Sequence, residues 1–135
     1  MPRPEKNRTI LQPPLMKGFK PFGIPRCKLE AVTLTFEEYE SIRLVNYENL
    51  QQKEAADLMN VSRPTLTRIY NKALTTITKA FVEGKAIVIE GGNYELSNDW
   101  YRCGKCHKLI EADNADVKCE NTEDCSTNEL INLNK

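Results

Sequence analysis

The sequence predicts a mainly α-helical fold, with an extended segment before the helices and a cysteine-rich segment after them. Three observations predict it. Six of the seven prolines fall within residues 1–32, and proline fixes φ and removes an amide donor, so this part is extended. Between residues 35 and 84, apolar side chains recur at the spacings of three and four that mark one helical face. After residue 98 the composition shifts to Cys, Lys, Asn and Asp.

These shifts divide the 135 residues into five expected parts. A short β-branched run at Ala86–Ile89, the turn residues Gly91 and Gly92, and then Tyr94–Leu96 are typical of a β-hairpin. The expected parts are a basic, proline-rich arm (1–34), a domain of three to four helices (35–84), a β-hairpin (85–97), a small metal-binding knuckle (98–127) and a polar tail (128–135).

Charge is distributed unevenly along the chain, although its formal net charge is zero. Residues 1–28 hold seven basic groups and one acidic group, whereas residues 86–135 hold five basic and ten acidic groups. The middle, 29–85, is nearly balanced, with seven basic and eight acidic groups. The net charge of the whole chain therefore conceals a basic arm, and it does not exclude a nucleic-acid partner.

The N-terminal residues contain no apolar run of the signal-peptide kind, and no window approaches the roughly 20 apolar residues of a membrane span. We therefore expect a cytoplasmic protein without a membrane partner. Five cysteines in such a chain favour metal or redox chemistry over structural disulfides.

The first helix is predicted to begin at Thr35. Thr35 and Glu38 have the spacing of a capping box, in which hydroxyl and carboxylate each accept from the other residue's amide. The stripe then steps by three to about Asn46, through Phe36, Tyr39, Ile42 and Val45.

Two further helices are predicted to meet at a tight corner. The second runs from about Leu50 to Met59, and Asn60 suits a left-handed corner residue. Ser62 can cap the third helix, which Gly84 ends. Its expected packing row is Leu66, Ile69, Tyr70, Ala73, Leu74, Ile77, Ala80 and Phe81. Two short helices at such a corner have the anatomy of a helix-turn-helix, whose second helix reads a DNA groove.

The third helix also has a polar face, which an ordinary buried helical hairpin would not need. Arginine can engage guanine O6 and N7 together, asparagine can read adenine, and lysine and threonine suit phosphates. Basic residues of the arm can follow phosphates or enter a minor groove, unless the arm is only a solvated leader. The candidate DNA contacts are Ser62, Arg63, Thr65, Thr67, Arg68, Asn71 and Lys72, with Arg3, Lys6 and Arg8 from the arm.

Several stretches together resemble one family of small prokaryotic predicted DNA-binding proteins. They are MPRP, FKPFGIP, LTFEEYESIRL, QKEAADLMNVSRPTLTRI and GKAIVIEGGNYEL, within about residues 1–96. The resemblance implies a helix-turn-helix similar to that of sigma-factor region four, and transcriptional regulation without a defined target. Asn60 replaces the glycine usual in such turns, and Pro64 replaces an expected polar side chain. Pro64 therefore removes one base contact, and it also blurs where the third helix starts.

The four cysteines of the C-terminal region form two pairs, Cys103-x2-Cys106 and Cys119-x5-Cys125. Two cysteine pairs on two loops are typical of a tetrahedral zinc site in a zinc-ribbon-like knuckle. The second spacing is unusual, so an iron or iron–sulfur site and redox thiols stay open, and His107 is an alternative ligand. Cys27 stands alone and is expected to be a packed or free thiol.

The sequence contains no constellation of catalytic residues and no phosphate-binding glycine loop, so we expect no enzyme. The expected function is sequence-specific binding of double-stranded DNA by a transcriptional regulator, as a homodimer on two half-sites. Two alternatives remain: an adaptor that contacts RNA polymerase or another regulator, and a metal- or redox-responsive switch acting through the cysteine knuckle.

The predicted knuckle can be tested by metal analysis of the purified protein. We expect about one zinc ion per chain, because four thiolates complete a tetrahedral site. Replacing Cys103 and Cys106 by serine should abolish metal binding, whereas Cys27→Ser should leave it intact. Iron in place of zinc would support the alternative cluster. The switch is tested by DNA binding with and without a chelator, and unchanged binding would rule it out.

Overall fold

The computed structural model of the chain describes residues 8–96, 99–103, 109–112 and 130–133. The chain divides into two compact units, Met1–Glu95 and Leu96–Lys135. Three α-helices dominate the described part, accompanied by short strands, so the prediction of a mainly α-helical fold with small β-elements is confirmed. None of the helices in these ranges has the length and apolar character needed to cross a membrane.

The helices of the first unit begin and end close to their predicted positions. Thr35 makes both bonds of the capping box with Glu38. Ser62 caps the third helix, and Gly84 ends it in the left-handed conformation. One π-helical turn, η2, follows the first helix. The elements are α1 (Phe36–Ile42), η2 (Arg43–Tyr47), α2 (Gln52–Leu58) and α3 (Arg63–Glu83).

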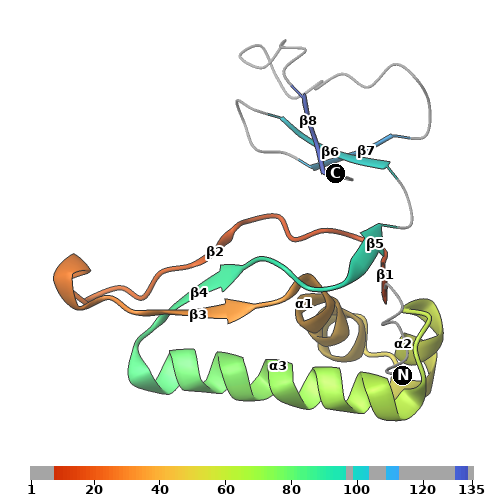
Figure 1. Cartoon of the computed structure of the whole chain (residues 1–135), viewed down its shortest axis with the longest axis horizontal. Helices are drawn as coiled ribbons and strands as arrows, with labels where there is room; N and C mark the ends of the chain where they lie inside the picture. The colour runs from red at the N-terminus through yellow and green to blue at the C-terminus, as the bar shows by residue number, and fades with distance from the viewer. Residues whose placement is uncertain (1–7, 97–98, 104–108, 113–129, 134–135) are drawn as a thin grey trace, which may run out of the picture. The chain divides into compact units, whose positions relative to one another are not determined.

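Short strands on either side of the helical segment form two small sheets (Figure 1). In one sheet the order is β2–β4–β3, with β4 antiparallel to β2 and parallel to β3; in the other, β1 pairs with β5. Parallel neighbours need a long crossover, which the three helices provide between β3 and β4. The strands are β1 (Arg8–Ile10), β2 (Gly18–Phe19), β3 (Ala31–Leu34), β4 (Ala86–Ile89) and β5 (Tyr94–Leu96), with one 3₁₀ turn, η1 (Arg26–Lys28).

The predicted hairpin over residues 85–97 is wrong. Both of its strands form, but β4 pairs with β2 and β3, whereas β5 pairs with β1. Gly91 and Gly92 do adopt positive φ between them, as a turn requires. The Gly91 carbonyl accepts from the amide of Phe36 at the start of α1, and Asn93 accepts from the amide of Arg8. Both strands therefore pair with strands that are distant in the sequence and not with each other.

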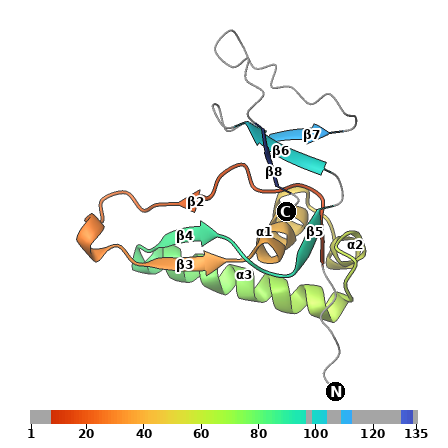
Figure 2. The ribbon, with the colours of Figure 1, turned by 45° about the horizontal axis from the view of Figure 1, so that its top comes forward.

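The core of the first unit consists of two clusters along α3. The first is where α2 and η2 meet the N-terminal part of α3, and its buried members are Leu44, Ala55, Ala56, Met59 and Leu66. The second lies between α3 and the β2–β4–β3 sheet, which runs along the helix in both ribbon views (Figures 1 and 2). Its buried members are Leu34, Ala73 and Ile89, and the predicted stripe of Phe36, Tyr39 and Ile42 packs against them.

The N-terminal arm, from residue 8 onward, is part of this core. Ile10 in β1 is completely buried. The amide of Thr9 donates to the carbonyl of Met59 at the end of α2, at 3.0 Å. The arm is extended, as its prolines predict, and it covers a second side of α1. Glu40 and Ser41 on that helix are therefore fully buried, which its apolar stripe alone did not predict.

The predicted packing row on α3 is too wide. Leu66, Ala73 and Ala80 are buried, whereas 37% of Leu74 and 86% of Phe81 is exposed. At 3.6 residues per turn, Phe81 projects about 100° away from Ala80. None of the described residues of the first unit buries that flank of the helix, so apolar character alone overestimated the buried row.

The buried carboxylate of Glu40 pairs with Arg43 one turn later. The Arg43 Nε lies 3.1 Å from the Glu40 Oε1, and the Arg43 side chain is nearly buried as well. Burial raises the pKa of Glu40, because a low-dielectric interior disfavours the ionised form. Arg43 and the backbone of the arm at Gln12 and Leu11 act in the opposite direction. The pair therefore joins η2, α1 and the arm.

Replacing Arg43 by methionine should destabilise the protein by about 3–5 kcal/mol near neutral pH, because it leaves a buried carboxylate without its partner. The loss of the guanidinium raises the pKa of Glu40 further. A carboxyl group whose pKa is raised in the folded state lowers the free energy of unfolding. This loss is complete above the folded-state pKa and vanishes below the unfolded value of 4.5, where the group is protonated in both states. The deficit should therefore shrink as the pH falls toward 4.5, as measured by urea unfolding at several pH values.

Two controls isolate this pair. Combining Arg43→Met with Glu40→Gln should restore much of the stability, since the buried charge is gone. Glu48 is the other ion-pair partner of Arg43, and its side chain is half exposed. Glu48→Ala should therefore lower the free energy of unfolding only slightly. A deficit that does not change with pH would contradict the assignment.

The second unit contains a three-stranded antiparallel sheet of order β7–β6–β8. Trp100 in the central strand is buried. Cys103 is the last residue of that strand, and its backbone pairs with Leu130. The strands are β6 (Asp99–Cys103), β7 (Leu109–Ala112) and β8 (Leu130–Asn132).

Candidate nucleic-acid interface

The corner between α2 and α3 has the conformation that its sequence predicts. Asn60 adopts φ 57°, in the left-handed region. The amide of Val61 donates back to the carbonyl of Ala56 at 3.0 Å, which closes the end of α2. Ser62 then caps α3, because its hydroxyl accepts from the amide of Thr65 at 3.4 Å. The start of α3 is thereby fixed beside the end of α2.

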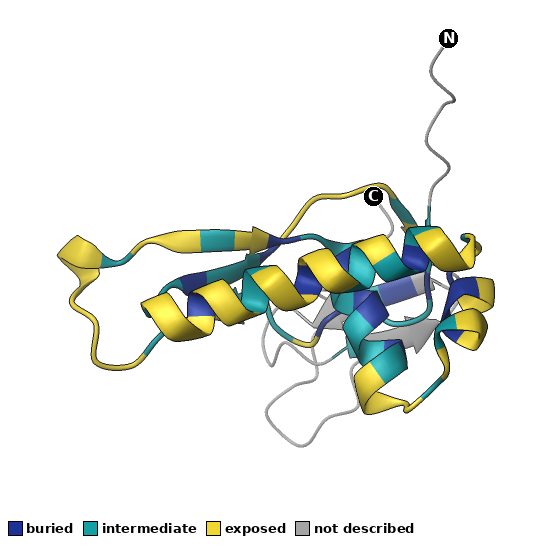
Figure 3. Ribbon diagram, turned by 90° about the horizontal axis from the view of Figure 1, so that it is seen from below, coloured by how far each residue is buried: buried dark blue, intermediate teal, exposed yellow. Residues whose placement is uncertain are grey.

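One side of α3 projects away from both core clusters, and we call it the polar face: Arg68, Asn71, Lys72, Thr75 and Lys79. All five residues are exposed, in contrast to the buried row of the same helix (Figure 3). At 3.6 residues per turn, each lies within about 60° of Arg68 around the axis. No acidic residue occurs between Arg63 and Val82, so this face carries only positive charge.

Thr67 lies beside this face, is half-buried, and its hydroxyl is held by hydrogen bonds within the protein. Its hydroxyl is 2.6 Å from the Oε1 of Gln52 in α2 and 3.0 Å from the carbonyl of Arg63. The contact with Gln52 joins the first turn of α2 to the first turns of α3. Thr67 is therefore placed to fix the angle between the two helices.

Arg63 is exposed at the first position of α3 but lies away from the polar face. Five residues before Arg68, it points about 140° away around the helix axis. There it lines a hollow of 450 Å³ together with Val45, Leu50 and the first residues of α2. The fold thus brings Arg68, Asn71 and Lys72 together, with Thr65 at the edge, and separates Arg63 from them.

The structure describes only one of the three basic residues of the arm that were predicted to contact DNA. Arg8 lies in β1, and its Nε is 3.1 Å from the Glu37 Oε2. Only 17% of its side chain is exposed, so its guanidinium serves the packing of the arm on α1. Arg3 and Lys6 lie outside the described residues.

Most of the predicted metal site also lies outside the described residues, including Cys106, Cys119, Cys125 and the alternative ligand His107. Only the backbone of Cys103 is described, at the end of β6. The predicted zinc or iron site therefore stays a prediction. Cys27, in η1, is an exposed free thiol.

The sequence did not predict an apolar groove on another flank of α3. Its 810 Å³ lie between the arm, α1 and the C-terminal half of α3, and Phe81 and Tyr47 are exposed at its rim. The one available signal was the width of the apolar row on α3, which exceeds what one core can cover.

The fold and the corner define a mainly α-helical protein in which two helices meet at a capped turn and leave one basic helix face exposed. The family model described as "Protein of unknown function DUF134" matches residues 1–97. This chain belongs to that family.

The relatives bear the name UPF0251 protein. The one from Chloroherpeton thalassium is 39% identical over 98% of this chain and 87% of its own length. Another, from Caldanaerobacter subterraneus subsp. tengcongensis, is 53% identical over 71% of this chain and 81% of its own length. One from a Thermoanaerobacter species is 49% identical over 76% of this chain and 90% of its own length. No solved structure matches the chain.

Replacing Thr67 by valine, which has the same shape, should destabilise the protein by about 1 kcal/mol through the lost hydrogen bond to Gln52. Thr75→Val is a matched control, because among the described residues the Thr75 hydroxyl bonds to the carbonyl of Asn71 within the same helix and to no other element. Thermal or urea unfolding measures both. Equal effects of the two substitutions would show that the bond between the helices contributes nothing.

Proposed function

We propose that this protein binds duplex DNA in a sequence-specific manner through a helix-turn-helix formed by α2 and α3, and that it regulates transcription. The observation that carries the proposal is the polar face of α3. It combines two long basic side chains, Lys72 and Lys79, with a potential base reader, Arg68, on one exposed side of α3, which has no acidic residue between Arg63 and Val82. A core helix needs none of this.

The geometry around the corner supports the proposal. In a helix-turn-helix, the second helix lies in the major groove and the first crosses the backbone. The Thr67–Gln52 hydrogen bond and the left-handed Asn60 fix α2 against α3. A rigid pair lets side chains of α3 keep one register in the groove, which sequence discrimination requires.

Four side chains of the polar face can then be given roles on DNA. Arg68 is the best candidate for a guanine, because its guanidinium can donate to O6 and N7 together. Asn71, one turn further, can pair with adenine N6 and N7. Lys72 and Lys79 can bind phosphates, which fix the register without reading sequence.

The N-terminal end of the interface has fewer readers than the sequence alone predicted. Pro64 has no side chain that can read a base, and Thr67 is held by α2. Arg63 points to another side of the helix, near the start of α2, so we assign it a phosphate contact rather than a base contact. The hydroxyls of Ser62 and Thr65 are hydrogen-bonded to each other. Only their remaining donor or acceptor positions can contact DNA. Specificity therefore rests mainly on Arg68 and Asn71.

The test is in-vitro selection on random duplex DNA, followed by binding of the selected site to variants of the full chain. Arg68→Ala should lose about 1–3 kcal/mol on that site and relax specificity at one base pair. Arg68→Lys keeps the charge but not the two-pronged geometry, so it should lose specificity while its salt dependence is unchanged.

Arg26→Ala is the matched control, since Arg26 is an exposed arginine of η1 outside α3. It should leave the base preference unchanged. If Arg68→Ala binds the selected duplex as tightly as the unaltered protein, the polar face is not the reading face. If binding to any duplex is insensitive to salt, an adaptor role on a protein partner replaces DNA binding, because phosphate contacts must weaken as salt rises.

A further inference from the structure

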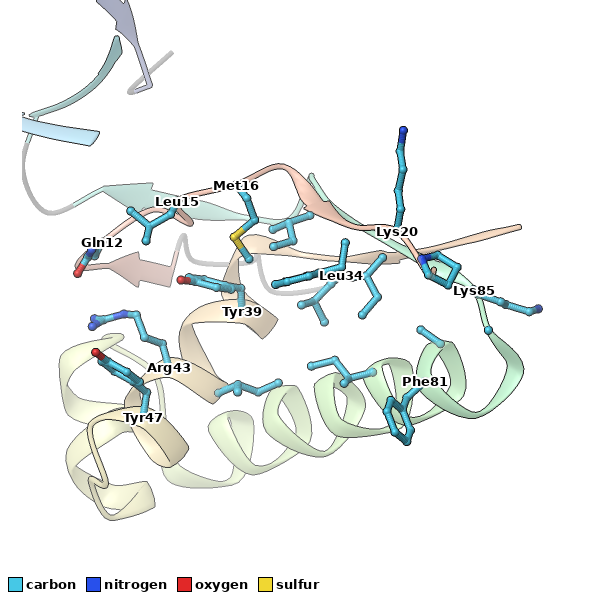
Figure 4. Close-up of a pocket in the computed structure, with 18 residues that line it drawn as sticks. Gln12, Leu15, Met16, Lys20, Leu34, Tyr39, Arg43, Tyr47, Phe81 and Lys85 are labelled. Carbon is cyan, nitrogen blue, oxygen red and sulfur yellow. The ribbon is translucent and has the colours of Figure 1, made fainter. Parts of the chain in front are cut away.

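We infer that a second copy of this chain binds in the apolar groove, so that the protein is a two-fold symmetric dimer held together along the C-terminal half of α3. The groove lies wholly within the first unit. Leu15 and Phe19 of the arm line it together with Ile77 and Phe81 of α3 and Leu34 of β3. In Figure 4, Leu15 lies on the arm, Phe81 on α3 and Leu34 between them.

The rim of this groove exposes large apolar side chains. Exposure reaches 86% for Phe81, 78% for Tyr47 and 61% for Phe19, and Leu15 is also mostly exposed. Exposed apolar groups are normal when scattered, but here four of them surround a single hollow of 810 Å³. A soluble chain gains free energy by covering such a surface.

The exposed area is enough for a dimer. A buried aromatic side chain covers 150–250 Å², so the exposed parts of the three aromatic residues amount to roughly 450 Å² per copy. With Leu15 and the floor of the groove added, two copies bury on the order of 1,000 Å² or more, which is the lower bound for a specific interface.

The surface is also complementary to itself. A two-fold interface uses the same patch on both subunits, so that patch must contain both a hollow and the groups that fill it. Here the hollow and the protruding Phe81 belong to one face and are adjacent in space. Phe81 of each copy can therefore enter the groove of the other. Other occupants, such as a small apolar ligand, would leave the rim side chains exposed.

This dimer leaves the proposed DNA-reading side chains accessible, a step that rests on the proposed function. Phe81 follows Arg68 by 13 residues, which places the two about 140° apart around α3 and about 20 Å apart along it. Two copies that meet near Phe81 therefore hold their Arg68 side chains up to about 40 Å apart. Half-sites on one face of DNA lie about 34–36 Å apart, so both copies can reach them.

Sedimentation equilibrium of the full chain, without DNA, tests the interface. The unaltered protein should have twice the chain mass of 15.5 kDa. Phe81→Glu should weaken the dimer at least about 100-fold, because it places an unpaired carboxylate in the apolar contact. Phe81 is mostly exposed, so the monomer should remain folded, with an unchanged circular dichroism spectrum.

Val82→Glu is the matched control. Val82 is the next residue, is also largely exposed and does not line the groove. This variant should remain dimeric. Phe19→Glu tests the opposite side of the groove on a different element and should give monomers as well.

A monomeric unaltered protein overturns the inference, whether the groove is open or is covered by residues 96–135 of the same chain. Equal dissociation of the Phe81 and Val82 variants, or dimers that resist both groove substitutions, overturns this interface. The failure of the proposed function is separate: a dimer sensitive to Phe81→Glu that binds no duplex retains the interface and loses only DNA binding.

Discussion

The inward row of α3 is the constraint on which the first unit depends. Leu66, Ala73 and Ala80 recur every seventh residue and are all buried. Two of them are alanines, which bring neighbouring elements close to the helix backbone. The helix consequently serves as the common packing partner of α1, α2 and β3. Leu66 belongs to the cluster with α2, and Ala73 to the cluster with the sheet, so one helix joins two otherwise separate cores.

Closure of that structure depends on the arm. β1 contributes the buried side chain of Ile10 to the core, and the amide of Thr9 in β1 donates to the carbonyl of Met59. β2 pairs with β4, which would otherwise be an edge strand on that side. The arm also explains the buried Glu40–Arg43 pair, because it removes water from a helix side that would otherwise face solvent. The N-terminal residues from Arg8 onward are therefore structural, even though their composition resembles that of a charged tail.

Features set within a few residues could be predicted from the sequence. The capping box at Thr35, the left-handed Asn60, the cap at Ser62 and the stop at Gly84 each depend on short-range hydrogen bonds or on φ. Features set by distant partners could not. The turn glycines after β4 favour a hairpin, but β5 pairs with β1, some 84 residues earlier in the chain. For the candidate interface, residue types predicted Arg68, Asn71 and Lys72. The contacts of Thr67 with Gln52 and of Arg8 with Glu37 could not be predicted, because they join residues that only the fold brings together.

The apolar period of α3 shows why sequence alone leaves function partly open. A stripe of given width is compatible with a core or with an interface, because both remove the same side chains from water. In α3 the stripe is wider than the core: Leu74 and Phe81 are exposed on a side of the helix away from the polar face, and Phe81 lines the groove. The helix thus has three different sides: one packs in the core, one lines the groove and one faces solvent. If the solvent side meets DNA and the groove meets a second copy, the length of α3 sets the spacing between two DNA contacts. A change in the register of that helix would then alter binding-site spacing without touching a single base-reading residue.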